Sequence, residues 1–144
     1  MNVNDILKAK GRDVATVAPD TTVTDAVRLL HRRGIGALVV SADGNSLDGI
    51  LSERDIVHAL AAHGAAVLDR RVAELMTRRV VTCTSNDTIA ELMGEMTRRR
   101  IRHLPVVDRG HLAGLVSIGD VVKNRLEEME SETTSLRQFI AGAA

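Results

Sequence analysis

Apolar residues recur at helical spacing in two segments of the chain. Each set occupies one face of a helix: Val23, Ala26, Val27 and Leu30 in the first segment, and Ile89, Leu92, Met93 and Met96 in the second. Each segment starts with a threonine that an acidic residue follows three positions later, Thr22 with Asp25 and Thr88 with Glu91. This pairing is typical of a capping box, so the pattern predicts helices that begin after Thr22 and after Thr88.

Short runs of β-branched and aliphatic residues predict the strands. Single short strands are expected near residues 16–17 and 81–84, and strand pairs at 37–40 with 48–51 and at 104–107 with 112–116. Helical segments at 3–7 and 72–76 precede each set, and closing helices are expected to start at Ser52 and Ser117. Strands that alternate with helices indicate an α/β (α+β) fold.

The two sets of elements are a tandem duplication. Thr16 aligns with Thr82 at a shift of 66 positions, and after a one-residue deletion Gly49 aligns with Gly114 at a shift of 65. We therefore divide the chain into a first repeat, residues 1–68, with an N-terminal lead-in helix, and a second repeat, residues 69–144, with an extended C-terminal helix. Residues 63–71 form the expected linker.

Composition narrows the class of protein. The 144 residues include 19 Lys and Arg and 19 Asp and Glu, a balance that gives no support for a nucleic-acid or membrane partner. Cys83 is the only cysteine, which excludes an internal disulfide and fits a reducing cytoplasm. The sequence shows neither a signal-peptide run nor a membrane-spanning run, so we expect a cytoplasmic protein.

One short motif occurs in both repeats. GILSERD at residues 49–55 and GLVSIGD at 114–120 share a glycine, two aliphatic residues, a serine and an aspartate at identical spacing. A strand that runs into a serine-capped helix explains this spacing, and the motif is then only a helix cap used twice. Alternatively, a carboxylate held at that helix start accepts hydrogen bonds from ligand hydroxyls, as a ribose would offer.

The repeat unit resembles the CBS domain, a small module named after cystathionine β-synthase. The resemblance rests on the strand–helix–strand–strand–helix order, the run RIRHLPVVD at residues 100–108 and the paired motifs, and it covers nearly the whole chain. It implies two β-α-β-β-α repeats packed as one pseudo-twofold module around a central cleft. It also implies a regulatory ligand of the adenosine class: AMP, ADP, ATP, S-adenosylmethionine or NAD.

The resemblance implies roles for individual residues. Asp55 and Asp120 would hold ribose hydroxyls, with Ser52 and Ser117 beside them, and the adenine would lie in an apolar slot next to the first strand of a repeat. The full set of candidate nucleotide-binding residues is Thr16, Val17, Ile35, Gly36, Ala37, Ser52, Arg54, Asp55, Thr82, Cys83, Ile101, Arg102, His103, Leu104, Pro105, Ser117 and Asp120.

The densest basic patch lies at residues 98–103. Arg98 and Arg99 fit a solvated helix C-terminus, where cations are favourable. Arg102 and His103 lead into a strand, where some family members place residues that contact phosphate. The matching positions in the first repeat are Gly36 and Ala37, so the two sites are expected to be inequivalent.

Two functions remain in contention, and neither is enzymatic. We expect a stand-alone adenine-nucleotide sensor that signals to an unidentified effector, because no catalytic signature surrounds Cys83 and no histidines have metal-ligand spacing. The other hypothesis is a ligand-free structural or dimerisation module. A heptad-like seam predicts pairing of the last helix in a homodimer, although that helix could instead fold back on its own domain. The seam residues are Val122, Leu126, Met129, Thr133, Leu136 and Ile140.

Overall fold

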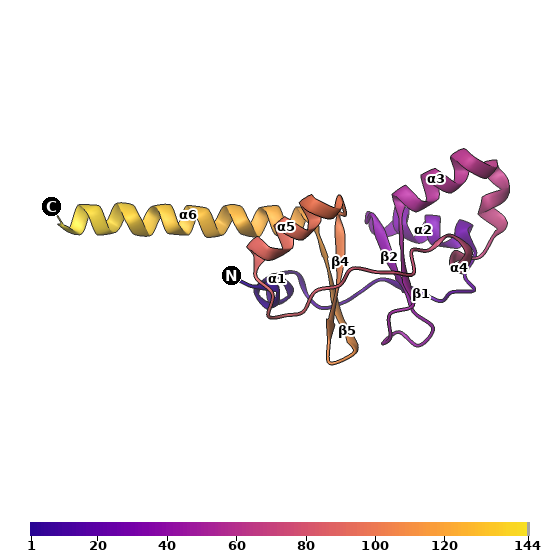
Figure 1. Cartoon of the computed structure of the whole chain (residues 1–144), viewed down its shortest axis with the longest axis horizontal. Coiled ribbons are helices and arrows are strands. Elements are labelled where there is room, and N and C mark those ends of the chain that lie inside the picture. The colour runs from indigo at the N-terminus through magenta and orange to yellow at the C-terminus, as the bar shows by residue number, and fades with distance from the viewer. Residues whose placement is uncertain (144) are drawn as a thin grey trace.

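Each half of the molecule is built on a small β-sheet, and the computed structural model describes residues 1–143 (Figure 1). The elements up to the expected linker are α1 (Val3–Lys10), β1 (Thr16–Val17), α2 (Val23–Arg33), β2 (Ala37–Val40), β3 (Gly49–Ser52), α3 (Glu53–His63) and a 3-10 helix, η1 (Gly64–Asp69). The later elements are α4 (Val72–Leu75), α5 (Ile89–Arg99), β4 (His103–Asp108), β5 (His111–Ser117) and α6 (Ile118–Ala143).

The two sheets have related topologies. In the first sheet β2 lies between a parallel neighbour, β1, and an antiparallel neighbour, β3. In the second sheet β4 and β5 are antiparallel, and the expected strand at 81–84 is reduced to one parallel bridge between Cys83 and Val106. The strand stops there because the backbone N–H of Thr84 bonds the carboxylate of Asp87 at 2.9 Å, which turns the chain.

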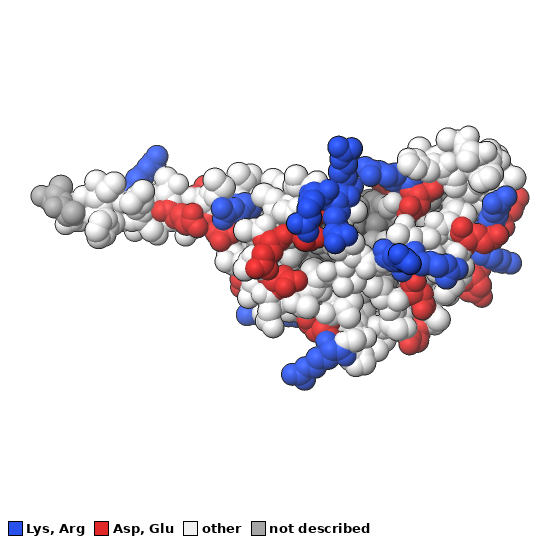
Figure 2. All heavy atoms as spheres, in the orientation of Figure 1, with Lys and Arg blue, Asp and Glu red and all other residues white. Residues whose placement is uncertain are grey.

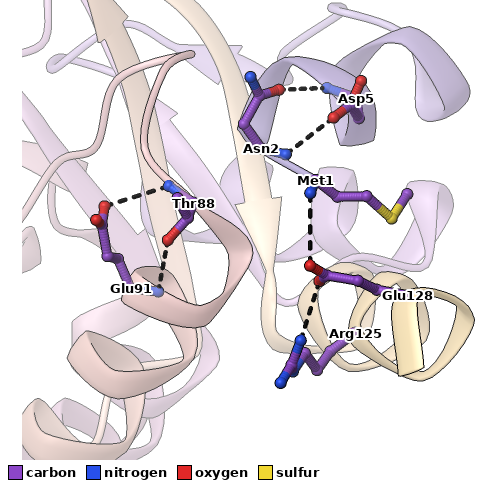
Figure 3. Close-up of polar contacts among 7 residues, drawn as sticks. All are labelled: Met1, Asn2, Asp5, Thr88, Glu91, Arg125 and Glu128. Atoms are coloured by element: carbon purple, nitrogen blue, oxygen red, sulfur yellow. Dashed lines mark hydrogen bonds and ion pairs between the residues drawn. The ribbon is translucent and has the colours of Figure 1, made fainter. Parts of the chain in front are cut away.

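Side-chain caps start the helices where the sequence predicts them. Thr88 and Glu91 form a reciprocal capping box at α5 (Figure 3). Ser52 with Asp55 does the same at α3. Thr22 caps α2 by accepting from the backbone N–H of Asp25, but the carboxylate of Asp25 lies 3.8 Å from Arg28 rather than completing a box.

The lead-in helices are exchanged between the halves. Val3, Ile6 and Leu7 of α1 are fully buried in the core formed by α5, α6, β4 and β5, which we call the second core. Val72 of α4 is buried in the first core, with α2, α3 and the three-stranded sheet. The division into residues 1–68 and 69–144 follows chain order, whereas each packed core takes its lead-in helix from the other repeat.

Two glycines make the exchange possible. A Cβ atom at Gly114 would lie 2.6 Å from Leu7, and a Cβ at Gly49 would lie 2.7 Å from the sulfur of Met76. The first glycine of the paired motif therefore admits the lead-in helix of the other repeat. An ion pair also links the N-terminus to α6: the amino group of Met1 lies 3.5 Å from the carboxylate of Glu128 (Figure 3).

The last helix leaves the body of the molecule (Figure 1). Its first turns pack on the second core through buried Val121, and Asn124 bonds the carbonyl of Asp120 at 2.7 Å. Beyond these turns its apolar side chains are exposed rather than folded back on their own half: Leu126, Met129, Leu136, Phe139 and Ile140. None of the helices within residues 1–143 combines the length and the apolar content that crossing a bilayer requires.

Candidate functional site

A cavity of about 340 Å³ lies at the junction of the two halves. This volume is within the range of small-molecule sites. Its lining comes from both repeats, and in the second repeat it includes the segment after α4: Gly36, Ile50, Ser52, Glu53, Arg54, Asp55, Thr77, Arg79, Val80, Val81, Arg100, Ile101, Arg102 and His103. A ligand bound here would contact both halves at once.

A carboxylate is fixed at one wall by the start of α3. The Oδ2 atom of Asp55 accepts the backbone N–H of Ser52 at 2.9 Å and its hydroxyl at 3.1 Å. The Oδ1 atom meets the hydroxyl of Thr77 at 3.4 Å, a distance longer than an ordinary O–H···O bond. Asp55 is therefore held in place by its cap while retaining capacity to accept hydrogen bonds from a ligand.

The segment that follows α4 forms the neighbouring part of the wall. Thr77 and Ile50 exchange both backbone hydrogen bonds, at 2.9 and 3.0 Å, so this segment extends the first sheet past β3. The next residues to line the cavity are Arg79, Val80 and Val81, and Ile101 adds apolar surface from the second repeat. Aliphatic side chains thus supply a surface on which a flat heterocycle could lie.

Four arginines surround the same space: Arg54, Arg79, Arg100 and Arg102. In Figure 2 basic side chains gather over the end of α5 and near the segment after α4. Arg100 ends α5 in the left-handed conformation (φ 55°), where the first repeat has Gly34 (φ 62°). A side chain is uncommon in that conformation, and here it places a guanidinium at the cavity. Arg54 also spans the halves by donating to the carbonyl of Arg100 at 3.3 Å.

The inequivalence of the two repeats has a packing reason. A Cβ atom at Gly36 would lie 3.2 Å from the imidazole of His103, so the first repeat leaves room for a side chain of the second. Burial lowers the pKa of His103, and Lys10 and Arg102 lower it further, while Glu53 and Asp120 oppose them. The ring is therefore mostly uncharged at neutral pH.

The other carboxylate of the paired motif has a different partner. Asp120 accepts the backbone N–H of Ser117 at 2.9 Å, as Asp55 does from Ser52. The ammonium of Lys10, at the end of α1, lies 2.6 Å from the same oxygen of Asp120 and donates to the carbonyl of Leu115 at 2.9 Å. Both ends of this ion pair are partly exposed.

The cavity gathers some of the candidate nucleotide-binding residues and not others. Those that line it are Gly36, Ser52, Arg54, Asp55, Ile101, Arg102 and His103. Those outside its lining are Thr16, Val17, Ile35, Ala37, Thr82, Cys83, Leu104, Pro105, Ser117 and Asp120. Cys83 is buried in the second core, and burial, with the charges of Asp87 and Asp108, raises its pKa to about 12, so its thiol is unreactive at neutral pH.

Sequence reasoning missed Ile50, Glu53, Thr77, Arg79, Val80, Val81 and Arg100. Residues 77–80 fall between the helix expected at 72–76 and the strand expected at 81–84, and only the pairing of Thr77 with Ile50 places them beside the cavity. A sequence signal existed for Arg100, because it aligns with Gly34. A glycine at the end of a helix is typical of the left-handed conformation, so the alignment indicates that Arg100 adopts that conformation with a side chain. Within residues 1–143 no cluster of His, Cys, Asp and Glu is placed to hold a metal ion.

Comparisons with known proteins agree on one family. The family model described as CBS domain matches residues 3–62 and again residues 72–127. The chain is 34% identical over 148 residues to a mitochondrial CBS domain-containing protein of Arabidopsis thaliana, covering 97% of this chain and 72% of that protein.

Solved structures share the fold. A CBS-domain containing protein from Agrobacterium tumefaciens matches with a TM-score of 0.83 and 51% identity, over 87% of this chain and 99% of the other. A CBS domain pair in complex with 5′-methylthioadenosine and S-adenosyl-L-methionine matches with a TM-score of 0.77 and 25% identity, over 89% of this chain and 98% of the other.

Proposed function

The chain belongs to the CBS-domain family, and on that premise we propose that it is a regulatory module that binds a phosphate-bearing adenine nucleotide at Asp55. The observation that supports this most directly is the composition of one cavity. It combines a capped carboxylate for ribose hydroxyls, aliphatic walls for a base and four guanidinium groups for phosphate.

Charge selects among the adenosine ligands. Four arginines face two acidic residues, Glu53 and Asp55, in the cavity lining. A guanidinium binds phosphate through paired, charge-assisted hydrogen bonds, whereas it repels the sulfonium cation of S-adenosylmethionine. The other ligand of the related complex, 5′-methylthioadenosine, has no phosphate for these arginines to bind. We therefore favour AMP, ADP, ATP or NAD over both. Occupancy would act on an effector by changing how the two halves, which both contribute to the wall, sit together.

Arg102→Ala is expected to lower affinity for AMP about tenfold while changing affinity for adenosine by less than about twofold. Adenosine has no phosphate to lose, and a charge-assisted hydrogen bond contributes roughly twice as much as a neutral one. Isothermal titration calorimetry with AMP, ADP, ATP, NAD and adenosine measures both effects and identifies the preferred nucleotide.

The matched control is Arg98→Ala. Arg98 is exposed and pairs with Glu95 on α5, outside the cavity. The Arg98→Ala variant should bind every ligand with the affinity of the unmodified protein. If both arginine variants weaken AMP equally, diffuse surface charge explains binding, and if the folded protein binds none of these ligands, the nucleotide proposal fails.

The second candidate, an assembly module, rests on α6. Exposed apolar side chains lie along it at heptad-like intervals: Val122, Leu126, Met129, Leu136 and Ile140. In a parallel pair of such helices, positions that flank the seam and are five residues apart lie next to each other across the dimer. Arg125 of one helix would then lie beside Glu130 of the other, and Glu132 beside Arg137. Antiparallel pairing does not place these partners opposite one another. We propose a homodimer through parallel α6 helices, which is compatible with nucleotide binding.

Leu136→Glu is expected to raise the dimer dissociation constant by more than about tenfold, because it places an uncompensated charge in an apolar seam. Ser135→Glu adds the same charge beside the seam and should have little effect. Sedimentation velocity at protein concentrations of about 1 to 100 µM, the range in which such contacts dissociate, would measure the dissociation constants of both variants. Arg137→Glu should also weaken the dimer, and adding Glu132→Arg should restore it; a monomeric unmodified protein would contradict the proposal.

A further inference from the structure

The carboxylates of Asp55 and Asp120 are equivalent in sequence but meet different chemistry. At Asp55 the nearby donor is the neutral hydroxyl of Thr77, 3.4 Å away. At Asp120 it is the ammonium of Lys10, 2.6 Å away. A ribose hydroxyl is a neutral donor like that of Thr77, so it can replace or join such a contact but competes poorly with a cation.

The ammonium of Lys10 makes two contacts by itself, one with a strand carbonyl and one with a carboxylate. At the first carboxylate, the corresponding two contacts come from the backbone N–H and the hydroxyl of Thr77. The backbone N–H of Thr77 donates to the carbonyl of Ile50 at 2.9 Å, and its hydroxyl reaches Asp55. Leu115 aligns with Ile50, and the ammonium of Lys10 donates to the carbonyl of Leu115 at 2.9 Å while it pairs with Asp120. The ammonium therefore lies on the carboxylate where a ligand ribose would bind.

Local sequence explains the difference. α4 ends at Leu75, since Met76 is extended (φ −61°, ψ 151°) and Thr77 then joins the first sheet. In α1 the residues that align with 77–79 are Lys8, Ala9 and Lys10, which favour a helix and continue it until Gly11 (φ 96°) ends it. The extra turn carries Lys10 to β5, so its side chain, rather than its backbone, reaches the strand.

We propose that Lys10 is a built-in occupant of the second carboxylate, so that each chain binds one nucleotide, at Asp55. This inference rests on the proposed nucleotide-binding function and adds the stoichiometry and its cause. Lys10 belongs to the swapped helix α1, so access to Asp120 depends on how α1 docks on the second core. Among residues 1–143, Lys10 is the cation that pairs with Asp120.

The lowered pKa of Asp120 is consistent with its pairing with Lys10. Burial would raise its pKa, but the ammonium of Lys10 and the backbone N–H of Ser117 outweigh burial and hold the pKa below its ordinary value. The ammonium and the backbone N–H share the Oδ2 atom of Asp120, so a ribose hydroxyl that bound at this atom would have to displace Lys10.

Calorimetric titration with AMP should show one binding event in the unmodified protein. Lys10→Met keeps most of the side-chain length without the charge. It should add a second event up to about fivefold tighter than any second event in the unmodified protein, since fivefold is the upper end of what a partly exposed ion pair contributes. Lys8→Met, an exposed lysine on the same helix, is the matched control and should leave a single event. Thermal melting checks that each variant is folded.

The double variant Lys10→Met with Asp55→Ala separates the sites, because the new event should survive when the first is lost. Two equal events in the unmodified protein, or no AMP binding by the double variant, would overturn the inference. If no folded variant binds AMP, the proposed function fails instead. Carbon-13 carboxyl titration then still tests the pair: Lys10→Met should raise the pKa of Asp120, and an unchanged value would overturn the role given to Lys10.

Discussion

Asp55→Ala is expected to weaken nucleotide binding about 10–100-fold. The carboxylate is the charged acceptor in the cavity that is fixed by its own helix cap, and losing a hydrogen bond to a charged group costs roughly 1.5–3 kcal/mol. Affinity for adenosine should fall by a similar factor as affinity for AMP, because the ribose is common to both. Calorimetry with the two ligands measures this, and it distinguishes Asp55 from Arg102, whose loss should affect AMP alone.

A stability control is needed because Asp55 also caps α3. Glu91→Ala removes the corresponding capping residue from α5, outside the cavity lining, and should cost about 1 kcal/mol of unfolding free energy without changing affinity. If Asp55→Ala binds nucleotide like the unmodified protein while melting like Glu91→Ala, the paired motif is only a helix cap.

Leu7→Ala should be the most destabilising simple substitution at the N-terminus, with a loss of about 2–5 kcal/mol in the free energy of unfolding. Leu7 is buried against Gly114, which has no side chain with which to fill the space left behind. Urea denaturation measures the loss. Amide hydrogen exchange should locate it, with protection falling more in β4 and β5 than in β2 and β3, although Leu7 lies in the first repeat.

Lys8→Ala is the matched control, since Lys8 is exposed on the same helix and should change stability by less than about 0.5 kcal/mol. Equal destabilisation by the two variants would mean that helix propensity, rather than packing in the second core, explains the effect. Loss of protection confined to β2 and β3 would contradict the exchange of lead-in helices.

Local signals in the sequence predict much of the fold. The caps at Thr88 and Ser52, the two amphipathic helices and both strand pairs depend on residues close together in the chain, and the structure confirms them. The duplication predicts two similar halves, and the CBS fold is confirmed by the solved relatives. The strand expected at 81–84 was only partly right, because Asp87 turns the chain after a single bridge.

Partners far apart in the chain could not be predicted in the same way. An apolar face at Val3, Ile6 and Leu7 shows that α1 is buried, but not which core buries it. For the same reason the alignment identified both carboxylates without showing that Asp55 shares a cavity with Arg102 of the other repeat. Lys10 gave no signal, since an exposed lysine near a helix end is ordinary on any surface.

The exchange of lead-in helices also sets the order in which the protein can be completed on the ribosome. All segments of the first core have been synthesised once Met76 has emerged, whereas the second core needs residues up to Val121. Until then α1 carries Val3, Ile6 and Leu7 without the surface that buries them, and closing so long a loop slows folding more than it lowers stability. The first helix to be made is therefore the last to be packed, and a nascent chain must keep its apolar face from other partners throughout translation.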